Sequence, residues 1–116
     1  MSRFAIVTLS ALALIGCATA GTARLTTAEK RGQTFAQAHC AQCHGVMPGT
    51  TSPNPESPAF EAIGNQPELT RETLATFLRD SHNFPAAMNF SVSAADVDDL
   101  TAYLLTLRKP GYKPAI

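Results

Sequence analysis

The sequence lacks the features that mark several large classes of protein. It contains no tryptophan, and nine acidic residues balance nine basic ones, which gives a formal net charge of zero. Because no basic run could follow a phosphate backbone, nucleic acid is not expected as a partner. No apolar run reaches the roughly 20 residues that a membrane-spanning helix needs, so membrane contact would have to come through the N-terminus. These absences favour a small soluble domain.

Cysteine is also scarce, and the three cysteines do not suggest a disulfide framework. Cys40 and Cys43 lie too close in sequence to look like a bridge that closes a structural loop, and Cys17 stands alone near the N-terminus. The 116 residues set a ceiling of one domain. Because processing would shorten that length, the mature chain is near the lower limit for burying its own core, and a cofactor would enlarge that core.

The N-terminus has the pattern of an export signal. Arg3 supplies positive charge, residues 4–15 are mostly apolar, and small residues follow. We therefore expect a protein of the periplasm or another exported space.

Two processing sites compete within this segment. Residues 18–20, Ala-Thr-Ala, suit an ordinary signal peptidase, which predicts a signal peptide over residues 1–20. Residues 14–17, Leu-Ile-Gly-Cys, closely resemble a bacterial lipobox. In that case residues 1–16 are removed and Cys17 carries a lipid. We favour the lipobox, which predicts a lipid-anchored lipoprotein.

Helix-start signals predict two helices in the first two thirds of the chain. Thr26 and Glu29 form a capping box that opens a helix over residues 27–39. Thr70 is a second N-cap, and the helix that follows it ends near Asp80.

A third helix is predicted near the C-terminus, where Ser93 and Asp96 resemble a capping box. No strand pattern or internal repeat is present, so the predicted class is all-α. The apolar stripe of this helix comprises Val97, Leu100, Tyr103, Leu104 and Leu107.

Residues 45–67 contain five prolines and three glycines, which forbid a long helix. A loop of this length in a small domain is commonly functional or disordered. Because Phe60, Ile63 and Leu69 place apolar anchors along it, we expect it to pack around a cofactor and not to act as a free linker.

The segment Cys40-Ala41-Gln42-Cys43-His44 carries the most specific chemistry. Two thiols three residues apart can add to the two vinyl groups of haem, and the next imidazole can reach the iron from the same side; C-x-x-C-H is a haem-attachment signature. A zinc site would need two more ligands, and a thioredoxin-like pair would need a βαβ unit, so both fit less well.

A chain with this motif resembles the class I cytochrome c family, and the resemblance covers residues 25–109. Residues 110–116 would form a C-terminal tail. The resemblance implies a cytochrome c fold in which three to four short helices surround one covalently bound haem c. It also implies that Gly32 in the first helix lets Tyr103 of the last helix approach closely. The segments that carry the resemblance are Gly32-Gln33-Thr34-Phe35, Ser57-Pro58-Ala59-Phe60, Met88-Asn89-Phe90 and Leu100-Thr101-Ala102-Tyr103-Leu104.

The resemblance also implies the remaining haem contacts. His44 would be the proximal iron ligand and Met88 the distal one, a Met/His pair that is typical of cytochromes c. Pro58 resembles the family proline whose carbonyl accepts a hydrogen bond from the proximal histidine, although Pro53 and Pro55 are nearby alternatives. The family usually has proline where this chain has Asn89.

Other side chains are weaker ligand candidates. His39 and Met47 are too close to the proximal histidine in sequence to reach the distal face, and Met47 would be a loop or haem-edge contact. His82 remains an alternative distal ligand, which would give a bis-histidine centre.

The predicted function is electron transfer by Fe(II)/Fe(III) cycling, not enzymatic catalysis, because both axial positions would be filled. Expected partners are a donor dehydrogenase and an acceptor oxidase or reductase, met by a monomer or by a subunit of a larger complex. Two alternatives stay open: a haem enzyme or gas-binding centre in which the distal ligand is labile, and a haem-bearing subunit of a respiratory complex.

Overall fold

The computed structural model describes residues 24–80 and 91–114. The predicted signal segment with Cys17 lies outside the described residues, as does the stretch that holds His82, Met88 and Asn89. The regular secondary structure of the described part is entirely helical and includes no strand, which confirms the predicted all-α class. Its four helices are α1 (Thr27–His39), α2 (Phe60–Gly64), α3 (Arg71–Asp80) and α4 (Ala94–Thr106).

The three longer helices begin at the predicted caps. Thr26 and Glu29 form the complete capping box of α1, in which each side chain accepts a hydrogen bond from the backbone N–H of the other residue, at 3.3 and 2.6 Å. Thr70 Oγ1 accepts from the Thr73 N–H at 3.2 Å and so caps α3.

The cap of α4 differs from a full capping box. Ser93 Oγ accepts from the Asp96 N–H at 3.1 Å, as expected. The Asp96 carboxylate, however, accepts from the Ser93 hydroxyl at 2.6 Å and not from the Ser93 backbone N–H. Aspartate has one methylene fewer than the usual glutamate, which accounts for the shorter return contact.

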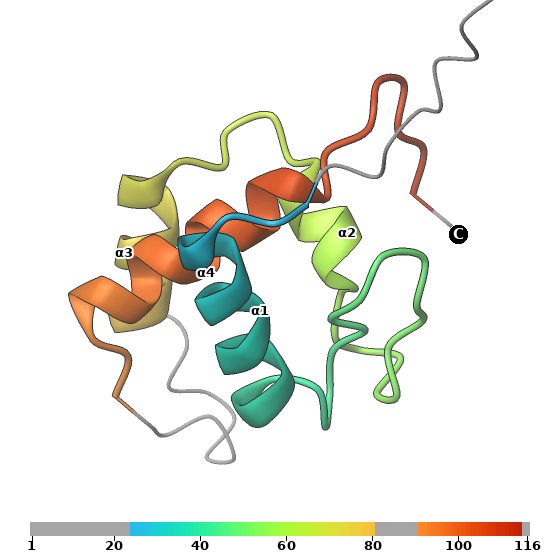
Figure 1. Ribbon diagram of the computed structural model, residues 1–116. Helices are drawn as coiled ribbons and strands as arrows, with labels where there is room; N and C mark the ends of the chain where they lie inside the picture. Colours follow the sequence, from blue (N-terminus) through green and yellow to red (C-terminus); the bar gives the residue numbers. More distant parts are fainter. Residues whose placement is uncertain (1–23, 81–90, 115–116) are drawn as a thin grey trace, which may run out of the picture.

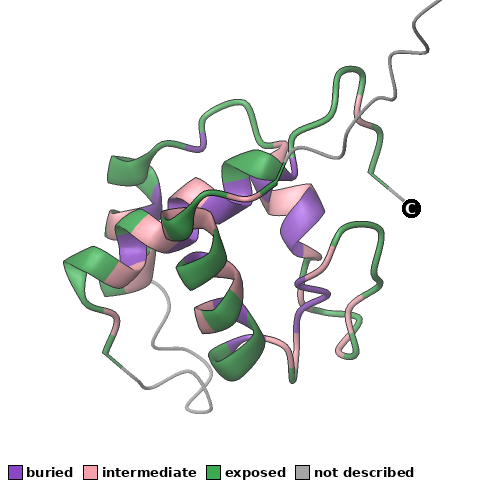
Figure 2. Ribbon diagram, in the orientation of Figure 1, coloured by how far each residue is buried: buried purple, intermediate pink, exposed green. Residues whose placement is uncertain are grey.

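Helix α4 is the centre of the fold, since α1, α2 and α3 all pack against it (Figure 1). The predicted stripe is its inner face, and every member is at most 4% exposed. Figure 2 shows this buried side of α4 turned toward the other helices. The stripe consists of Val97, Leu100, Tyr103, Leu104 and Leu107.

Helix α1 crosses α4 at very short range. A Cβ atom added to Gly32 would lie 2.0 Å from the Asp99 carbonyl oxygen and 2.9 Å from the Tyr103 Cβ. Only glycine allows this approach, which confirms the predicted Gly32–Tyr103 pair. Beside the crossing, Arg31 forms two hydrogen bonds to the Asp99 carboxylate, at 2.6 and 2.7 Å. This guanidinium holds the pKa of Asp99 below its ordinary value.

The long loop after α1 packs onto the core, as predicted. Phe60 and Leu69 are buried, and Ile63 packs against the same cluster. The loop contains one short helix, α2, in place of a linker. Gly64 at its end approaches the Leu104 carbonyl so closely that an added Cβ would lie 2.4 Å from that oxygen.

Polar contacts join the end of α4 to the α2 region. Arg108 donates to the carbonyl oxygens of Gly64 and Leu69, at 2.8 and 3.0 Å. Asn65 donates to the Leu107 carbonyl at 3.0 Å and accepts from the Lys109 N–H at 2.8 Å. These bonds satisfy carbonyl groups that a helix end and a loop would otherwise leave unpaired.

The Gly32 crossing gives a direct test of the fold. Gly32→Ala should destabilise the holoprotein by about 3 kcal/mol, because the new methyl group meets backbone that cannot move independently of α4. Thermal unfolding followed by circular dichroism would measure the loss. Thr34→Ala is the matched control on the exposed side of α1 and should change stability by no more than about 0.5 kcal/mol. Equal melting temperatures for Gly32→Ala and the wild type would contradict the close crossing.

Candidate functional site

The Cys40–His44 segment forms a single tight turn at the end of α1. The Cys40 N–H donates to the Ala36 carbonyl at 2.8 Å, which extends the helical pattern by one residue. The N–H groups of Cys43 and His44 then both donate to the Cys40 carbonyl, at 3.1 and 2.9 Å. This turn brings the side chains of Cys40 and His44 to the same cavity.

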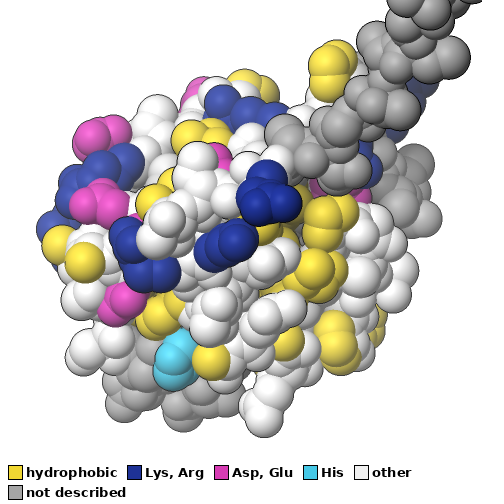
Figure 3. Space-filling model, viewed as in Figure 1, with side chains coloured by type: hydrophobic (Ala, Val, Ile, Leu, Met, Phe, Trp, Pro, Cys, Tyr) yellow, Lys and Arg dark blue, Asp and Glu magenta, His cyan; other side chains and the backbone are white. Residues whose placement is uncertain are grey.

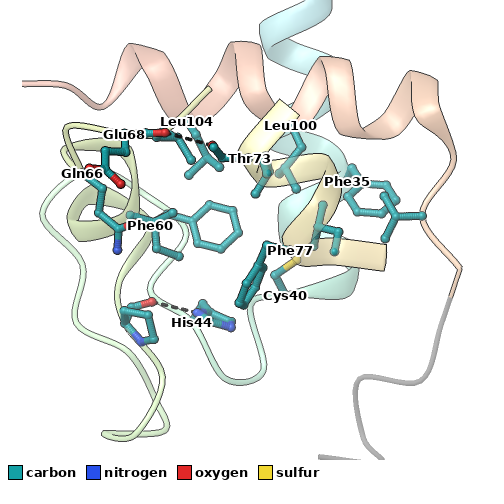
Figure 4. A pocket seen from close by; sticks show the side chains of 16 residues that line it. Phe35, Cys40, His44, Phe60, Gln66, Glu68, Thr73, Phe77, Leu100 and Leu104 are labelled. Atoms are coloured by element: carbon teal, nitrogen blue, oxygen red, sulfur yellow. Dashed lines mark hydrogen bonds between the residues drawn. The ribbon is translucent and has the colours of Figure 1, made fainter. Parts of the chain in front are cut away.

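The cavity has a volume of about 430 Å³, within the usual range for a small-molecule site. Figure 4 shows Cys40 and His44 on one side of it, with aromatic and aliphatic side chains around the rest. A group of polar side chains, Gln66, Glu68 and Thr73, lies at the side away from His44. The apolar wall consists of Phe35, Pro58, Phe60, Ile63, Leu69, Leu74, Phe77, Leu78, Val92, Leu100 and Leu104.

His44 is held in a defined orientation. It is only 8% exposed, and its Nδ1 lies 2.7 Å from the Pro58 carbonyl oxygen. Because a carbonyl oxygen can only accept, Nδ1 carries the hydrogen and donates it. This tautomer has its lone pair on Nε2, the atom that can bind a metal. The Phe60 ring contacts the imidazole edge-on, with ring centroids 5.6 Å apart.

The sequence left three prolines open for this contact, and the structure selects Pro58. Neither Pro53 nor Pro55 lines the cavity, whereas Pro58 does. The Gly45 carbonyl accepts from the Phe60 N–H at 2.8 Å, which holds the backbone after His44 against the start of α2. The Pro58 carbonyl therefore has a fixed position relative to the imidazole.

The two cysteines of this turn are not joined by a disulfide and lie in different surroundings. Cys40 is 6% exposed, and burial raises its pKa to about 11. Cys43 is half-buried and does not line the cavity. Within residues 24–80 and 91–114, no three metal-binding side chains of the His, Cys, Asp or Glu type come together.

The structure places His39 and Met47 away from the cavity. His39 contacts the Phe35 ring on α1, with centroids 4.6 Å apart. Met47 lies between α1 and α4, where its sulfur accepts from the side-chain amides of Gln33 and Gln37 at 3.5 and 3.4 Å. The interpretation of Met47 as a loop residue is confirmed, whereas a contact with the cavity is not seen.

Helix α4 also fixes the loop after His44. Tyr103 is 1% exposed, and its hydroxyl donates to the Val46 carbonyl at 2.7 Å. Burial raises the Tyr103 pKa, so the hydroxyl stays a donor at neutral pH. On the other side of the loop, Glu61 accepts from the Gly49 N–H at 3.2 Å and pairs with Lys109, whose hydrogen bond lowers the Glu61 pKa.

Known proteins resemble this chain along most of its length. A family model described as "Cytochrome C oxidase, cbb3-type, subunit III" matches residues 27–104. Cytochrome c-552 of Bradyrhizobium diazoefficiens is 30% identical over 95 residues, which cover 82% of this chain and 89% of that protein. The chain belongs to the class I c-type cytochromes. As a member of that family it is an electron-transfer protein with a covalently attached haem c. No solved structure gives a significant match.

The cavity of this cytochrome fits a haem group. A porphyrin is a flat apolar ring with two carboxylates on one edge, and the cavity combines an apolar wall with polar side chains at one side. Phe77 lines the cavity and is 49% exposed, which is unusual for a large aromatic residue in a small domain. A bound haem would cover this ring and account for its position.

Sequence reasoning did not find two parts of the cytochrome site. In the polar group, Gln66 and Glu68 come from the connection between α2 and α3 and Thr73 from the first turn of α3, and no sequence motif marks them as part of a site. The Tyr103–Val46 hydrogen bond was also missed. A buried tyrosine needs a partner for its hydroxyl, and this general rule was the available signal.

Proposed function

We propose that thioether bonds from Cys40 and Cys43 hold the haem and that His44 is the proximal ligand of its iron. The observation that carries this proposal is the 2.7 Å hydrogen bond from His44 Nδ1 to the Pro58 carbonyl, at the wall of an apolar cavity shared with Cys40. When bound, the haem supplies an iron centre that takes up and releases one electron.

The side chains of this chain tune that centre. The Pro58 carbonyl keeps the Nδ1–H of His44 in place, which fixes the ring and makes Nε2 more basic. The apolar wall, including Phe60 and Leu100, excludes water from the haem face and so favours the iron state of lower charge. Gln66 and Thr73 line the cavity and would be the polar side chains available to the haem carboxylates.

Met88 is proposed as the distal ligand. It lies outside the described residues, so its support is the sequence: it stands shortly before the Ser93 cap, in a Met-x-Phe segment that resembles the family pattern. With both axial positions filled by protein, the iron has no site for a substrate. This ligand set favours an electron carrier over a haem enzyme.

The proposed partners are exported redox proteins, a dehydrogenase as electron donor and an oxidase or reductase as acceptor. A second assignment, as a subunit of a respiratory complex, is favoured by the match to an oxidase-subunit family. Stable co-purification with an oxidase would support the role of a complex subunit. A monomer after gentle membrane extraction would support a carrier that moves between a donor and an acceptor.

Export and lipid attachment through Cys17 complete the proposal. The described residues contain no helix that is both long and apolar enough to cross a bilayer. Lipid on Cys17 would join the domain to a membrane without such a helix.

Covalent attachment of the haem is the first test of the site. The intact mass should exceed that of the processed polypeptide by one haem, and the colour should remain with the protein in acid extraction. Cys43→Ala should leave one thioether, which shifts the absorption band of the reduced protein, while Cys17→Ala should leave the spectrum unchanged. Haem that extracts freely from the wild type would refute the attachment.

Axial ligation by Met88 predicts a weak far-red absorption band in the oxidised protein. Met88→Ala should abolish this band, lower the reduction potential and allow carbon monoxide to bind the reduced iron, because a thioether stabilises ferrous iron. Met47→Ala is the matched control and should do none of these. A band that persists in Met88→Ala would overturn the assignment, and its absence from the wild type would make His82 the ligand to test.

Lipid attachment predicts that the protein fractionates with membranes through Cys17. Cys17→Ser in the precursor should release it into the soluble fraction, since anchoring depends on the buried acyl chains. The mass of the wild-type N-terminal peptide should include the lipid. A wild-type N-terminus at Gly21, with equal solubility of both proteins, would instead establish cleavage after Ala20.

A further inference from the structure

Charged residues are absent from the two stretches of sequence that would contact the haem iron. No Asp, Glu, Lys or Arg occurs between Arg31 and Glu56, and none occurs between Asp80 and Asp96. The first stretch contains Cys40, Cys43 and His44, and the second contains Met88. A chain with 18 charged residues out of 116 therefore concentrates them elsewhere.

The structure shows that the first stretch forms an accessible surface that carries no Asp, Glu, Lys or Arg and includes the exposed His39. Ala38, Gln42 and Pro53 are exposed, and Ala41 and Cys43 are half-buried. We call the surface formed by Ala38, Ala41, Gln42 and Cys43 the attachment face. Figure 3 shows Lys, Arg, Asp and Glu side chains over the upper and left parts of the molecule, while the lower part, where α1 ends, carries uncharged side chains and a histidine.

Several charges elsewhere on the molecule pair with one another. Arg31 pairs with Asp99, Arg71 with Asp98, and Lys109 with Glu61. Leu78 lines the cavity, and the next two residues in the sequence, Arg79 and Asp80, have opposite charges. No sequence segment that flanks the attachment face therefore has a large excess of positive or of negative residues.

The attachment face is also where electrons would enter and leave, an argument that rests on the proposed function. Cys43 is half-exposed and lies outside the cavity lining, so a haem edge bonded to its sulfur would be close to the surface. The two haem carboxylates lie on the edge opposite the vinyl groups and would not charge this face. A redox partner must come near this edge, because electron transfer weakens steeply with distance.

We propose that the attachment face docks a redox partner whose own contact surface is uncharged. A charged partner surface would lose its hydration here without gaining an opposite charge, so an uncharged surface is the complementary one. Apolar and dipolar contacts would then hold the complex. Association would proceed without charge steering, at rate constants of about 10⁵–10⁶ M⁻¹s⁻¹, and would depend weakly on salt.

Oxidation of the reduced holoprotein by washed membranes of the organism that encodes it tests the chemistry of the partner. The rate should change less than about twofold between roughly 10 and 200 mM salt. Gln42→Lys and Gln42→Glu should each be oxidised no faster than the wild type. A faster Gln42→Lys variant would identify an acidic partner, a faster Gln42→Glu variant would identify a basic one, and either result would overturn the proposal.

Electron self-exchange between two copies of the protein tests the face itself, because two haem edges must meet. Two like charges brought to about 7 Å in water repel by roughly one RT, so Gln42→Lys should slow self-exchange about threefold at low salt and recover at high salt. Leu105→Lys adds the same charge to an exposed position at the α2 end of α4 and should match the wild type. Equal slowing by both variants would refute the assignment of the face.

These outcomes separate the docking face from the proposed function. Small inorganic reagents should oxidise and reduce the haem reversibly in the wild type and in all variants, with equal haem content per protein. Failure of that cycling would refute the electron-transfer assignment for this haem site. Normal cycling with strongly salt-dependent oxidation by membranes would refute only the uncharged docking surface.

Discussion

The close crossing of α1 and α4 at Gly32 is the contact on which the rest of the molecule depends. It fixes the direction in which α1 delivers Cys40, and it places Tyr103 where its hydroxyl can reach the Val46 carbonyl. The same helix α4 supplies Leu100 and Leu104 to the cavity wall. One glycine thus sets the relative positions of the attachment turn, the loop after it and the floor of the haem site.

The helices were predictable because their signals are local. The caps at Thr26, Thr70 and Ser93 and the apolar stripe of α4 depend only on residues within a few turns, and the structure confirms each of them. The short helix α2 was not predicted, since five residues carry too little periodicity. The contacts of Asn65 and Arg108 join segments about 40 residues apart, and local patterns contain no information on such pairings.

The candidate site shows the same contrast between local sequence signals and contacts of distant segments. Cys40, Cys43 and His44 are adjacent in sequence, so their geometry follows from a single turn. Pro58 could be proposed only by resemblance, because it lies 14 positions after His44 in the sequence. The polar side chains of Gln66, Glu68 and Thr73 meet the cavity through the packing of α2 and α3, a tertiary effect. Met88 stays a prediction.

The Arg31–Asp99 pair joins residues that are 68 positions apart in the sequence. A chain that emerges from a translocation pore with its N-terminus first cannot close the α1–α4 crossing until residue 99 has followed. Contacts between residues so far apart in sequence form late in folding, because the entropy cost of closing the long loop comes before the contacts stabilise the chain. During that interval the Cys40 thiol, buried in the folded protein, is still accessible. For a chain exported as proposed above, the topology would leave a period after export in which haem could be attached before the core closes around it.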